Sequence, residues 1–230
     1  MNSNNIDSLS DEYVEKEGEY FSNPRLDVIR FIENESGLKI LELGAGNGAT
    51  LFELKKRNIA SEIHLLDIID KVDKKDVFDS VTILDIVTGD LSFEDNYFDC
   101  IICADVLEHI YEPHLVIDKL KRVLKNDGIF LVSLPNFRHF SAIKKVLFKR
   151  SFAYEDSGIF DRTHKRFYCK KDMIQLFDDH DDLQLESIKS NSWFLKWNRL
   201  INPITLTLFE DYLTLQYILK IRKHKQSNGE

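Results

Sequence analysis

The 230-residue sequence predicts an α/β fold with a doubly wound, mostly parallel sheet. Three observations lead to this prediction. Short apolar runs alternate with amphipathic segments as far as Pro135, and the first run stops at a glycine turn, Gly44-Ala45-Gly46-Asn47-Gly48. Acids follow the next two apolar runs directly, at Asp67 and Asp85. Continuous apolar runs are typical of parallel strands that are covered on both faces.

The expected elements alternate between helix and strand. Up to Pro135 they are a helix at about 24–35, a strand at 39–43, a helix at about 47–57, strands at 62–66, 81–84 and 98–103, a helix after Pro113, a turn at 126–128 and a strand at 129–134. Beyond Pro135 they are a basic amphipathic helix at 137–149, a loop at 151–163, a helix at 170–178, a partly helical stretch at 193–210, and strands at 183–189 and 213–222.

The domain organisation follows from the same pattern. Residues 1–18 are Asn- and Ser-rich at their start and predict a disordered or loosely packed arm. A single domain is expected over 19–223, with a lid at about 136–170 and a flexible tail at 224–230.

Composition restricts the class of protein. A formal net charge of −8 disfavours a general nucleic-acid binder. Cys100 and Cys103 lie in an apolar run, which favours a buried strand over a redox or zinc pair. We therefore expect no metal site. The sequence has no apolar run of 18 residues and a polar N-terminus, so we expect no membrane span, no signal peptide and a cytoplasmic location, with at most peripheral membrane contact.

Positive charge is concentrated in one segment. Residues 138–171 hold ten Lys or Arg and three acids, a local charge of +7 in an acidic chain. Such a contrast is typical of a surface that meets an anionic partner. A solvated basic helix face explains it equally well.

The glycine turn predicts the kind of cofactor. Glycine permits positive φ and lets a ligand approach the backbone closely. The spacing G-x-G-x-G differs from the G-x-G-x-x-G of dinucleotide sites, which disfavours a hydride-transferring dehydrogenase. Glu42 precedes the first glycine by two positions. An acid there is unfavourable for a pyrophosphate and suits a cofactor with an ammonium and a sulfonium group.

The acids at strand ends extend this hypothesis, because ligands of open α/β sheets bind at the carboxyl ends of strands. Asp67 lies 19 residues after Gly48, where a carboxylate can accept both ribose hydroxyls. Asp85 is placed to accept an adenine amino group. Each acid, taken singly, is better explained as a solvated turn residue or a helix cap, whereas their joint occurrence at strand ends favours a ligand site. The neighbours of these acids and the loop after the fourth strand complete the predicted cofactor contacts: Ile68, Ile86, Ala104, Asp105, Val106 and His109.

Several motifs together resemble those of class I S-adenosylmethionine-dependent methyltransferases. They are Ile-Leu-Glu-Leu-Gly-Ala-Gly-Asn-Gly, Leu-Leu-Asp-Ile, Leu-Asp-Ile, Phe-Asp-Cys-Ile-Ile-Cys-Ala-Asp-Val-Leu-Glu-His-Ile and Lys125-Asn126-Asp127-Gly128, which departs from the usual Lys-Pro-Gly-Gly. The resemblance runs from about 20 to 223. It implies a Rossmann-like fold with a seven-stranded sheet of order 3-2-1-4-5-7-6, the seventh strand antiparallel. It also implies S-adenosylmethionine as cofactor and S-adenosylhomocysteine as product.

Residues 154–168, 19–25 and 134–136 are similar to segments of bacterial methyltransferases associated with surface-polysaccharide biosynthesis. This resemblance implies methyl transfer to a hydroxyl of a nucleotide-linked or lipid-linked sugar. The alternatives are a methyltransferase for another small metabolite, such as a quinone or lipid precursor, and a non-catalytic cofactor-binding module. No Asn- or Asp-Pro-Pro-aromatic motif follows the fourth strand, which disfavours methylation of nucleobase amino groups.

A hydroxyl acceptor needs a base within reach. His164 is the candidate, with Asp161 to hold its tautomer; otherwise Asp161 or Thr163 caps the next helix and His164 only packs. His109 is expected to orient its loop rather than to act directly. The candidate acceptor contacts are Tyr20, Asn136, Arg138, Tyr154, Lys144 and Lys145, the two lysines as partners of phosphates.

Overall fold

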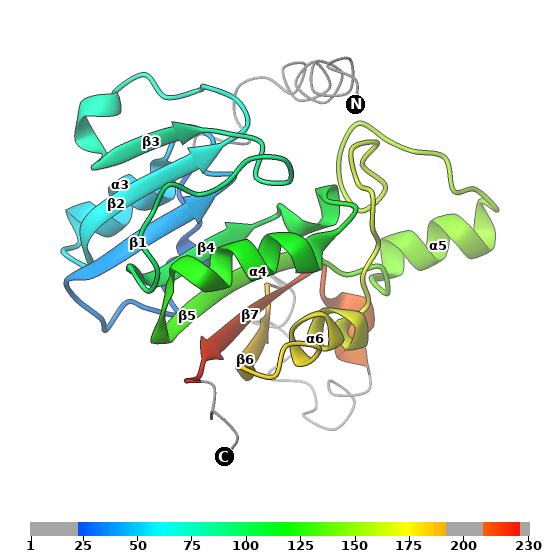
Figure 1. The fold of residues 1–230 in the computed structure, drawn as a ribbon. Coiled ribbons are helices and arrows are strands. Elements are labelled where there is room, and N and C mark those ends of the chain that lie inside the picture. Colours follow the sequence, from blue (N-terminus) through cyan, green and yellow to red (C-terminus); the bar gives the residue numbers. More distant parts are fainter. Residues whose placement is uncertain (1–22, 192–208, 226–230) are drawn as a thin grey trace. The chain divides into compact units, whose positions relative to one another are not determined.

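The computed structural model describes residues 23–191 and 209–225. A seven-stranded sheet has the order β3-β2-β1-β4-β5-β7-β6, which confirms the predicted order (Figure 1). β7 runs antiparallel to both β5 and β6, also as predicted. The strands are β1 (Leu38–Leu43), β2 (Ala60–Asp67), β3 (Ser80–Ile83), β4 (Phe98–Ala104), β5 (Leu124–Pro135), β6 (Leu183–Ser190) and β7 (Gln216–Lys223).

The helices connect these strands. They are α2 (Leu26–Ile29), α3 (Ala49–Lys56), α4 (Pro113–Val123), α5 (Phe140–Phe148) and α6 (Lys170–Asp178), with single 3₁₀ turns η1 (Lys75–Val77) and η2 (Leu107–His109). Among the described helices, none combines the length and the apolar character needed to cross a membrane.

The described chain divides into two compact units. The first comprises residues 23–102 and 115–125, and the second comprises 103–114, 126–191 and 209–225. Each unit is described by itself, and the single domain over 19–223 stays a prediction.

The first unit is built on the parallel strands β1, β2 and β3. α3 packs against β2 through Leu51 and Leu54, which are completely buried. Burial of each such side chain contributes about 1.5–3 kcal/mol. The register pairs Leu43 with Leu66 and Asp67 with Ile83, so the ends of the three strands are level with one another. This register brings the residues that follow β1 and β2 together.

The second unit is built on the antiparallel strands β5, β7 and β6, with α6 beside β6 (Figure 1). α6 buries Met173 and Phe177. A smaller apolar cluster supports the loop after α5, where Ala142, Ile159 and Phe160 are buried. This cluster fixes the loop that leads to His164.

Three predicted boundaries are wrong. The first helix ends at Ile29 rather than near 35, because single turns replace it: Phe31 N donates to Val28 O and Ile32 N to Ile29 O. The turn predicted at 126–128 is part of β5, which begins at Leu124. Asp127 has a φ of 63° there, so the direction change is made inside the strand.

The third correction concerns the basic helix, which begins at Phe140 rather than 137. Phe137 N donates to Tyr168 O at 2.8 Å, and this bond keeps the preceding residues extended. Cys100 and Cys103 are buried in the strand β4, as predicted. The predicted N-terminal arm and most of 193–210 lie outside the described residues.

Candidate functional site

The glycine turn after β1 depends on the absence of side chains. Gly44, Gly46 and Gly48 all have positive φ, at 69°, 57° and 78°. A Cβ on Gly48 would lie 2.3 Å from Cζ of Phe78, so an L-residue there requires the Phe78 ring to move as well as an unfavourable φ. The turn is therefore a close-fitting backbone surface at the start of α3.

Asp67 holds the same turn from the end of β2. Its Oδ2 accepts from Gly46 N at 2.7 Å, and its Oδ1 accepts from Ile69 N at 3.0 Å. Burial raises the pKa of Asp67, and these backbone N–H groups oppose the shift. The structure thus brings Asp67 to the glycine turn. Each carboxylate oxygen retains a lone pair for a ligand hydroxyl.

Glu42 tests whether the turn fits a cationic group. The side chain is 4% exposed, and its Oε2 is buried without a hydrogen-bond partner among the described residues. Burial raises the pKa of Glu42 to about 8, against the opposing effect of the Thr50 hydroxyl. A buried carboxyl oxygen without a donor is well suited to the ammonium group of S-adenosylmethionine. The turn therefore fits the cofactor that the sequence predicts.

Asp85 forms a turn after β3. Its Oδ1 accepts from Val87 N at 2.9 Å and its Oδ2 from Thr88 Oγ1 at 3.0 Å, which is the turn-capping arrangement that the sequence left open. Ile86 is buried and Ile68 is half-buried, both in the first unit. The adenine contacts of these three residues stay a prediction.

Lys119 on α4 fixes the loop after β3, and sequence reasoning missed it. Its Nζ donates to the carbonyl oxygens of Ile86, Val87 and Gly89 at 3.0, 3.0 and 2.7 Å. Three backbone acceptors converge on one ammonium group, so Lys119 determines the shape of this loop. No local sequence signal identifies a lysine that binds carbonyls about 30 residues away.

In the second unit, Asp105 follows β4 in a strained conformation, with a φ of 59°. Its Oδ1 accepts from Ser133 Oγ at 2.6 Å and from Gln216 Nε2 at 3.0 Å. These two partners, on β5 and β7, were also missed by sequence reasoning. Ala104 and Val106 are half-buried on either side of Asp105. The cofactor contacts predicted for this loop stay a prediction.

A cluster of ionisable side chains lies where η2 meets the segment around His164, which follows the loop after α5. Its members are Glu108, His109 and His164, whose potential metal-ligand atoms all lie within 4.8 Å of one another. The imidazole centroids of His109 and His164 are 4.8 Å apart, edge to face. His109 Nδ1 lies 3.2 Å from Thr163 O, so His109 joins its loop to this segment. This contact agrees with the orienting role expected of His109.

The support of His164 by the Asp161 carboxylate stays a prediction, and the structure gives each of the two residues a backbone contact. His164 Nδ1 lies 3.0 Å from Ile159 O, and this carbonyl acceptor requires a proton on Nδ1. The Asp161 carboxylate accepts from Thr163 N at 2.9 Å and from Thr163 Oγ1 at 2.6 Å. The tautomer of His164 is therefore set by a backbone carbonyl, while Asp161 closes the turn before it.

Two of the predicted acceptor contacts have structural partners. Asn136 is completely buried, and its Nδ2 donates to Asp211 O and Thr214 O at 2.6 and 2.9 Å. Arg138 donates to Asp211 Oδ2 at 2.9 Å and lies over the ring of Tyr212. These contacts give both residues a role in joining the end of β5 to the residues before β7.

The remaining acceptor candidates differ in exposure. Lys145 is buried: its Nζ donates to Ala153 O and to Glu155 Oε1 and lies over the ring of Phe160. Its charge is thus already compensated, which disfavours the phosphate role. Lys144 and Tyr154 are exposed. Tyr20 lies outside the described residues.

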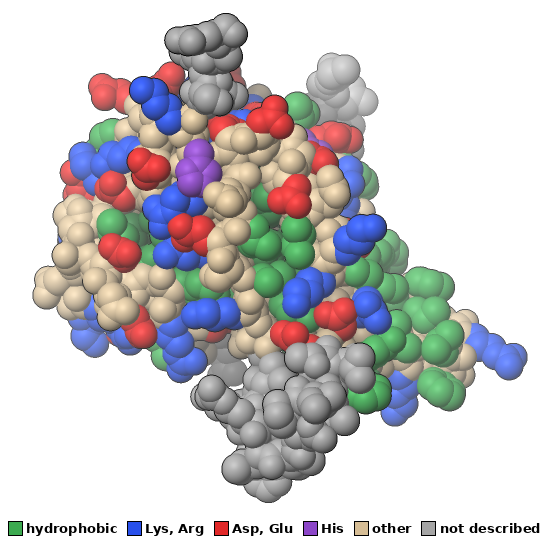
Figure 2. Space-filling view, turned by 90° about the horizontal axis from the view of Figure 1, so that it is seen from below, with side chains coloured by type: hydrophobic (Ala, Val, Ile, Leu, Met, Phe, Trp, Pro, Cys, Tyr) green, Lys and Arg blue, Asp and Glu red, His purple; other side chains and the backbone are tan. Residues whose placement is uncertain are grey.

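Exposed apolar side chains gather over α5 and the loop after it. Figure 2 shows this group of hydrophobic side chains at the right of the view, with basic side chains beside it. The exposed apolar residues are Phe140, Leu147, Phe148, Phe152 and Tyr154. A hollow of about 410 Å³ on this surface is lined by Phe140, Ile143, Lys144, Phe148 and Tyr212. The surface can accept a ligand that is partly apolar and partly anionic.

Two comparisons with known sequences show what this chain is similar to. Residues 41–132 match the family model described as a methyltransferase domain. A curated relative, the ubiquinone biosynthesis O-methyltransferase of Glaesserella parasuis serovar 5 (strain SH0165), is 34% identical over 59 residues. That match covers 26% of this chain and only a quarter of the relative's length. The cofactor that a methyltransferase domain of this kind implies is S-adenosylmethionine.

Solved structures agree in fold along most of the chain. A chain from the complex between the Haloferax volcanii Trm112 methyltransferase activator and a putative methyltransferase has a TM-score of 0.63 at 14% identity, with 96% of both chains covered. A SAM dependent methyltransferase from Archaeoglobus fulgidus has a TM-score of 0.60 at 16% identity, covering 86% of this chain and 90% of that one. The chain therefore has the class I S-adenosylmethionine-dependent methyltransferase fold, and its residues 41–132 match the model of a methyltransferase domain.

Proposed function

We propose that the protein transfers the methyl group of S-adenosylmethionine to a hydroxyl oxygen of a small acceptor that carries a sugar. The observation that carries the proposal is the cluster of Glu108, His109 and His164, because an alcohol must lose its proton as it is methylated. In the reaction the acceptor oxygen forms a bond to the methyl carbon, the carbon–sulfur bond breaks, and the hydroxyl proton leaves.

The protein's contributions are binding, orientation and proton removal. The glycine turn and Glu42 are proposed to bind the methionine end of the cofactor and Asp67 the ribose. The proton leaves at the cluster, where His164 is the candidate base. Because its Nδ1 faces the Ile159 carbonyl, the lone pair of the neutral imidazole is on Nε2.

The surface over α5 supports an acceptor whose sugar is linked to a phosphate and an apolar chain. Lys144 lies among apolar residues in the hollow and supplies a positive charge there. A lipid-linked saccharide combines these features. The proposal therefore includes a role for the protein in polysaccharide biosynthesis.

A second acceptor class is favoured by a different observation. The curated relative carries the name of an O-methyltransferase of ubiquinone biosynthesis, and the α5 hollow is largely apolar. A hydroxylated quinone precursor is therefore the alternative acceptor, with the same cofactor and the same cluster.

The proposal is tested first through the cofactor. S-adenosylhomocysteine should raise the melting temperature of the full chain, and NAD should not. Labelled S-adenosylmethionine is then incubated with nucleotide sugars, lipid-linked saccharides and hydroxylated quinones, and methylated products are counted. Transfer to a saccharide supports the first proposal, and transfer to quinones alone replaces it with the second.

A cofactor-bound chain that methylates no acceptor would favour the non-catalytic alternative. A protein activator would then be tested, since one structural neighbour comes from a complex with the Trm112 activator. A chain stabilised by NAD and not by S-adenosylhomocysteine would contradict the cofactor assignment.

A further inference from the structure

We infer that Glu108, His109 and His164 form a binding site for a divalent transition-metal ion. Glu108 and His109 belong to η2, and His164 is reached only after more than fifty further residues. One carboxylate oxygen and two imidazole nitrogens nevertheless lie within 4.8 Å of one another. Two histidines and one carboxylate form a common set of protein ligands for zinc and iron.

Both imidazoles are held in the orientation that metal ligands require. His109 Nδ1 lies 3.2 Å from Thr163 O, and His164 Nδ1 lies 3.0 Å from Ile159 O. A backbone carbonyl at Nδ1 fixes the tautomer with the proton there and places the lone pair of the neutral ring on Nε2, which is the arrangement common in metal-binding histidines.

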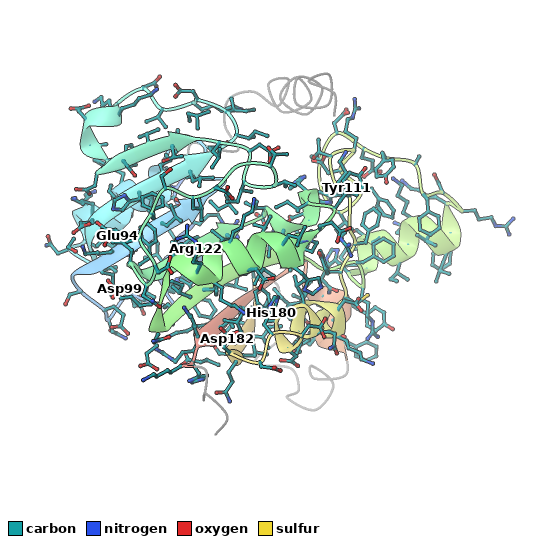
Figure 3. The ribbon with its side chains drawn as sticks, viewed as in Figure 1. Glu94, Asp99, Tyr111, Arg122, His180 and Asp182 are labelled. Atoms are coloured by element: carbon teal, nitrogen blue, oxygen red, sulfur yellow. The ribbon has the colours of Figure 1, made fainter. Side chains whose placement is uncertain are left out.

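The backbone connects the two segments that supply the ligands. Lys165 N and Arg166 N both donate to Glu108 O, at 2.8 and 3.0 Å. Arg166 Nε donates to the carbonyl of Tyr111, which Figure 3 labels, at 2.7 Å. These bonds hold η2 against the segment around His164, so the backbone of both ligand-bearing segments is held in place before any ion binds.

Two of the three proposed ligands are shielded from water. Glu108 is 1% exposed and His164 is 7% exposed.

The donor set selects the class of ion. Imidazole nitrogens suit Zn²⁺, Fe²⁺ and related ions, whereas Mg²⁺ and Ca²⁺ prefer oxygen. At metal–ligand distances of about 2.1 Å, two ligands of a tetrahedral site lie about 3.4 Å apart. The ligand atoms lie within 4.8 Å of one another, so side-chain rotations must bring them together by up to about 1.4 Å when an ion binds.

The role of the ion rests on the proposed function. Three protein ligands leave at least one coordination position open for the acceptor hydroxyl. A bound ion would supply Lewis acidity: it would lower the pKa of the coordinated hydroxyl and so promote loss of its proton to solvent as the oxygen attacks the methyl carbon. His164 would then hold the ion together with Glu108 and His109.

The inference is tested by metal titration of the full chain without an affinity tag, after treatment with a chelator. Calorimetry with ZnCl₂ and with MgCl₂ is compared, and CoCl₂ is followed by its visible absorption. We expect one Zn²⁺ per chain, no comparable Mg²⁺ binding, and a Co²⁺ spectrum typical of nitrogen ligands.

His164→Ala and His109→Ala should each weaken Zn²⁺ binding by about 100-fold, with the far-ultraviolet circular dichroism retained. His114→Ala is the matched control, because His114 is a half-buried imidazole that contacts His180 rather than the cluster. Binding that is unchanged in both cluster variants, or lost equally in the control, would overturn the site.

The outcomes separate the site from the proposed function. Zn²⁺ binding without any stabilisation by S-adenosylhomocysteine would leave the metal site standing and remove the methyltransferase proposal. Stabilisation by S-adenosylhomocysteine without Zn²⁺ binding would remove the metal site and leave the methyltransferase proposal standing. If both bind, methyl transfer should fall after chelation and return on addition of Zn²⁺; activity that ignores the metal would reject its role in the reaction.

Discussion

Glu42 illustrates how burial prepares one side chain for a charged ligand. The native protein holds this carboxyl proton up to about pH 8, while an unfolded chain releases it near its usual value of 4.5. The native state thus binds more protons between these values, so its free energy of unfolding falls as the pH rises from 4.5 towards 8. An ammonium group beside Glu42 reverses the preference and favours the ionised form.

We predict that S-adenosylhomocysteine binds more tightly at about pH 8.5 than at about pH 6.5 and releases a proton on binding near neutral pH. Calorimetry in buffers of different ionisation enthalpy measures that proton. Glu42→Gln should abolish both the release and the pH dependence. Glu53→Gln is the control on α3, because Glu53 pairs with Arg57 at the surface, and it should leave both unchanged. Proton release by the Glu42→Gln variant equal to that of the wild type would contradict the assignment.

At Gly48, both the positive φ and the nearby Phe78 ring restrict which residue the turn can hold. We predict that Gly48→Ala lowers the free energy of unfolding by about 1–3 kcal/mol and weakens cofactor binding, because it combines positive φ with a contact to Phe78. Denaturant unfolding measures the loss. In a Phe78→Ala background the substitution should cost less; an equal cost in both backgrounds would assign the whole effect to φ.

At the scale of elements, α4 determines the loop after β3 through Lys119. We predict that Lys119→Met weakens binding of S-adenosylhomocysteine several-fold and lowers stability by about 1–3 kcal/mol, since three carbonyls lose their donor. Lys121→Met is the control on the same helix, because its ammonium lies 3.6 Å from Asp118 one turn away. An equal effect of the two substitutions would indicate a general loss of helix stability.

α5 presents the charge that is proposed to bind an anionic acceptor. We predict that Lys144→Glu raises the KM for a phosphate-linked acceptor by about tenfold and leaves cofactor binding unchanged. Lys149→Glu makes the same charge change at an exposed position outside the residues lining the hollow and should have a smaller effect. Equal KM values in the wild type and in Lys144→Glu would refute the acceptor role of this surface.

For the whole molecule, the cofactor should protect distant segments at once. We predict that S-adenosylhomocysteine slows amide hydrogen exchange at residues 44–48 and 85–89, which the structure places in the first unit. Exchange in residues 104–109 tests the contacts that the sequence predicts for that loop. Protection confined to sites remote from the glycine turn would contradict the proposed binding site.

The sequence by itself determined the glycine turn and the place of Asp67, and its resemblance to class I methyltransferases implied the strand order. The turn and the acid depend on local patterns: an apolar run, glycines that must have positive φ, and an acid directly after a strand. Helix ends were predicted less well. The first helix and the helix after Pro135 are limited by bonds that local patterns do not reveal, such as that from Phe137 to Tyr168.

The tertiary structure alone decided which distant side chains meet. It showed that His164 Nδ1 faces the Ile159 carbonyl, that Glu155 compensates Lys145, and that Lys119 binds the loop after β3. It also brought Glu108, His109 and His164 together, although no metal-ligand spacing is present in the sequence. Hydrogen bonds and ligand sets depend on distances across the fold, and a one-dimensional pattern contains no information on those distances.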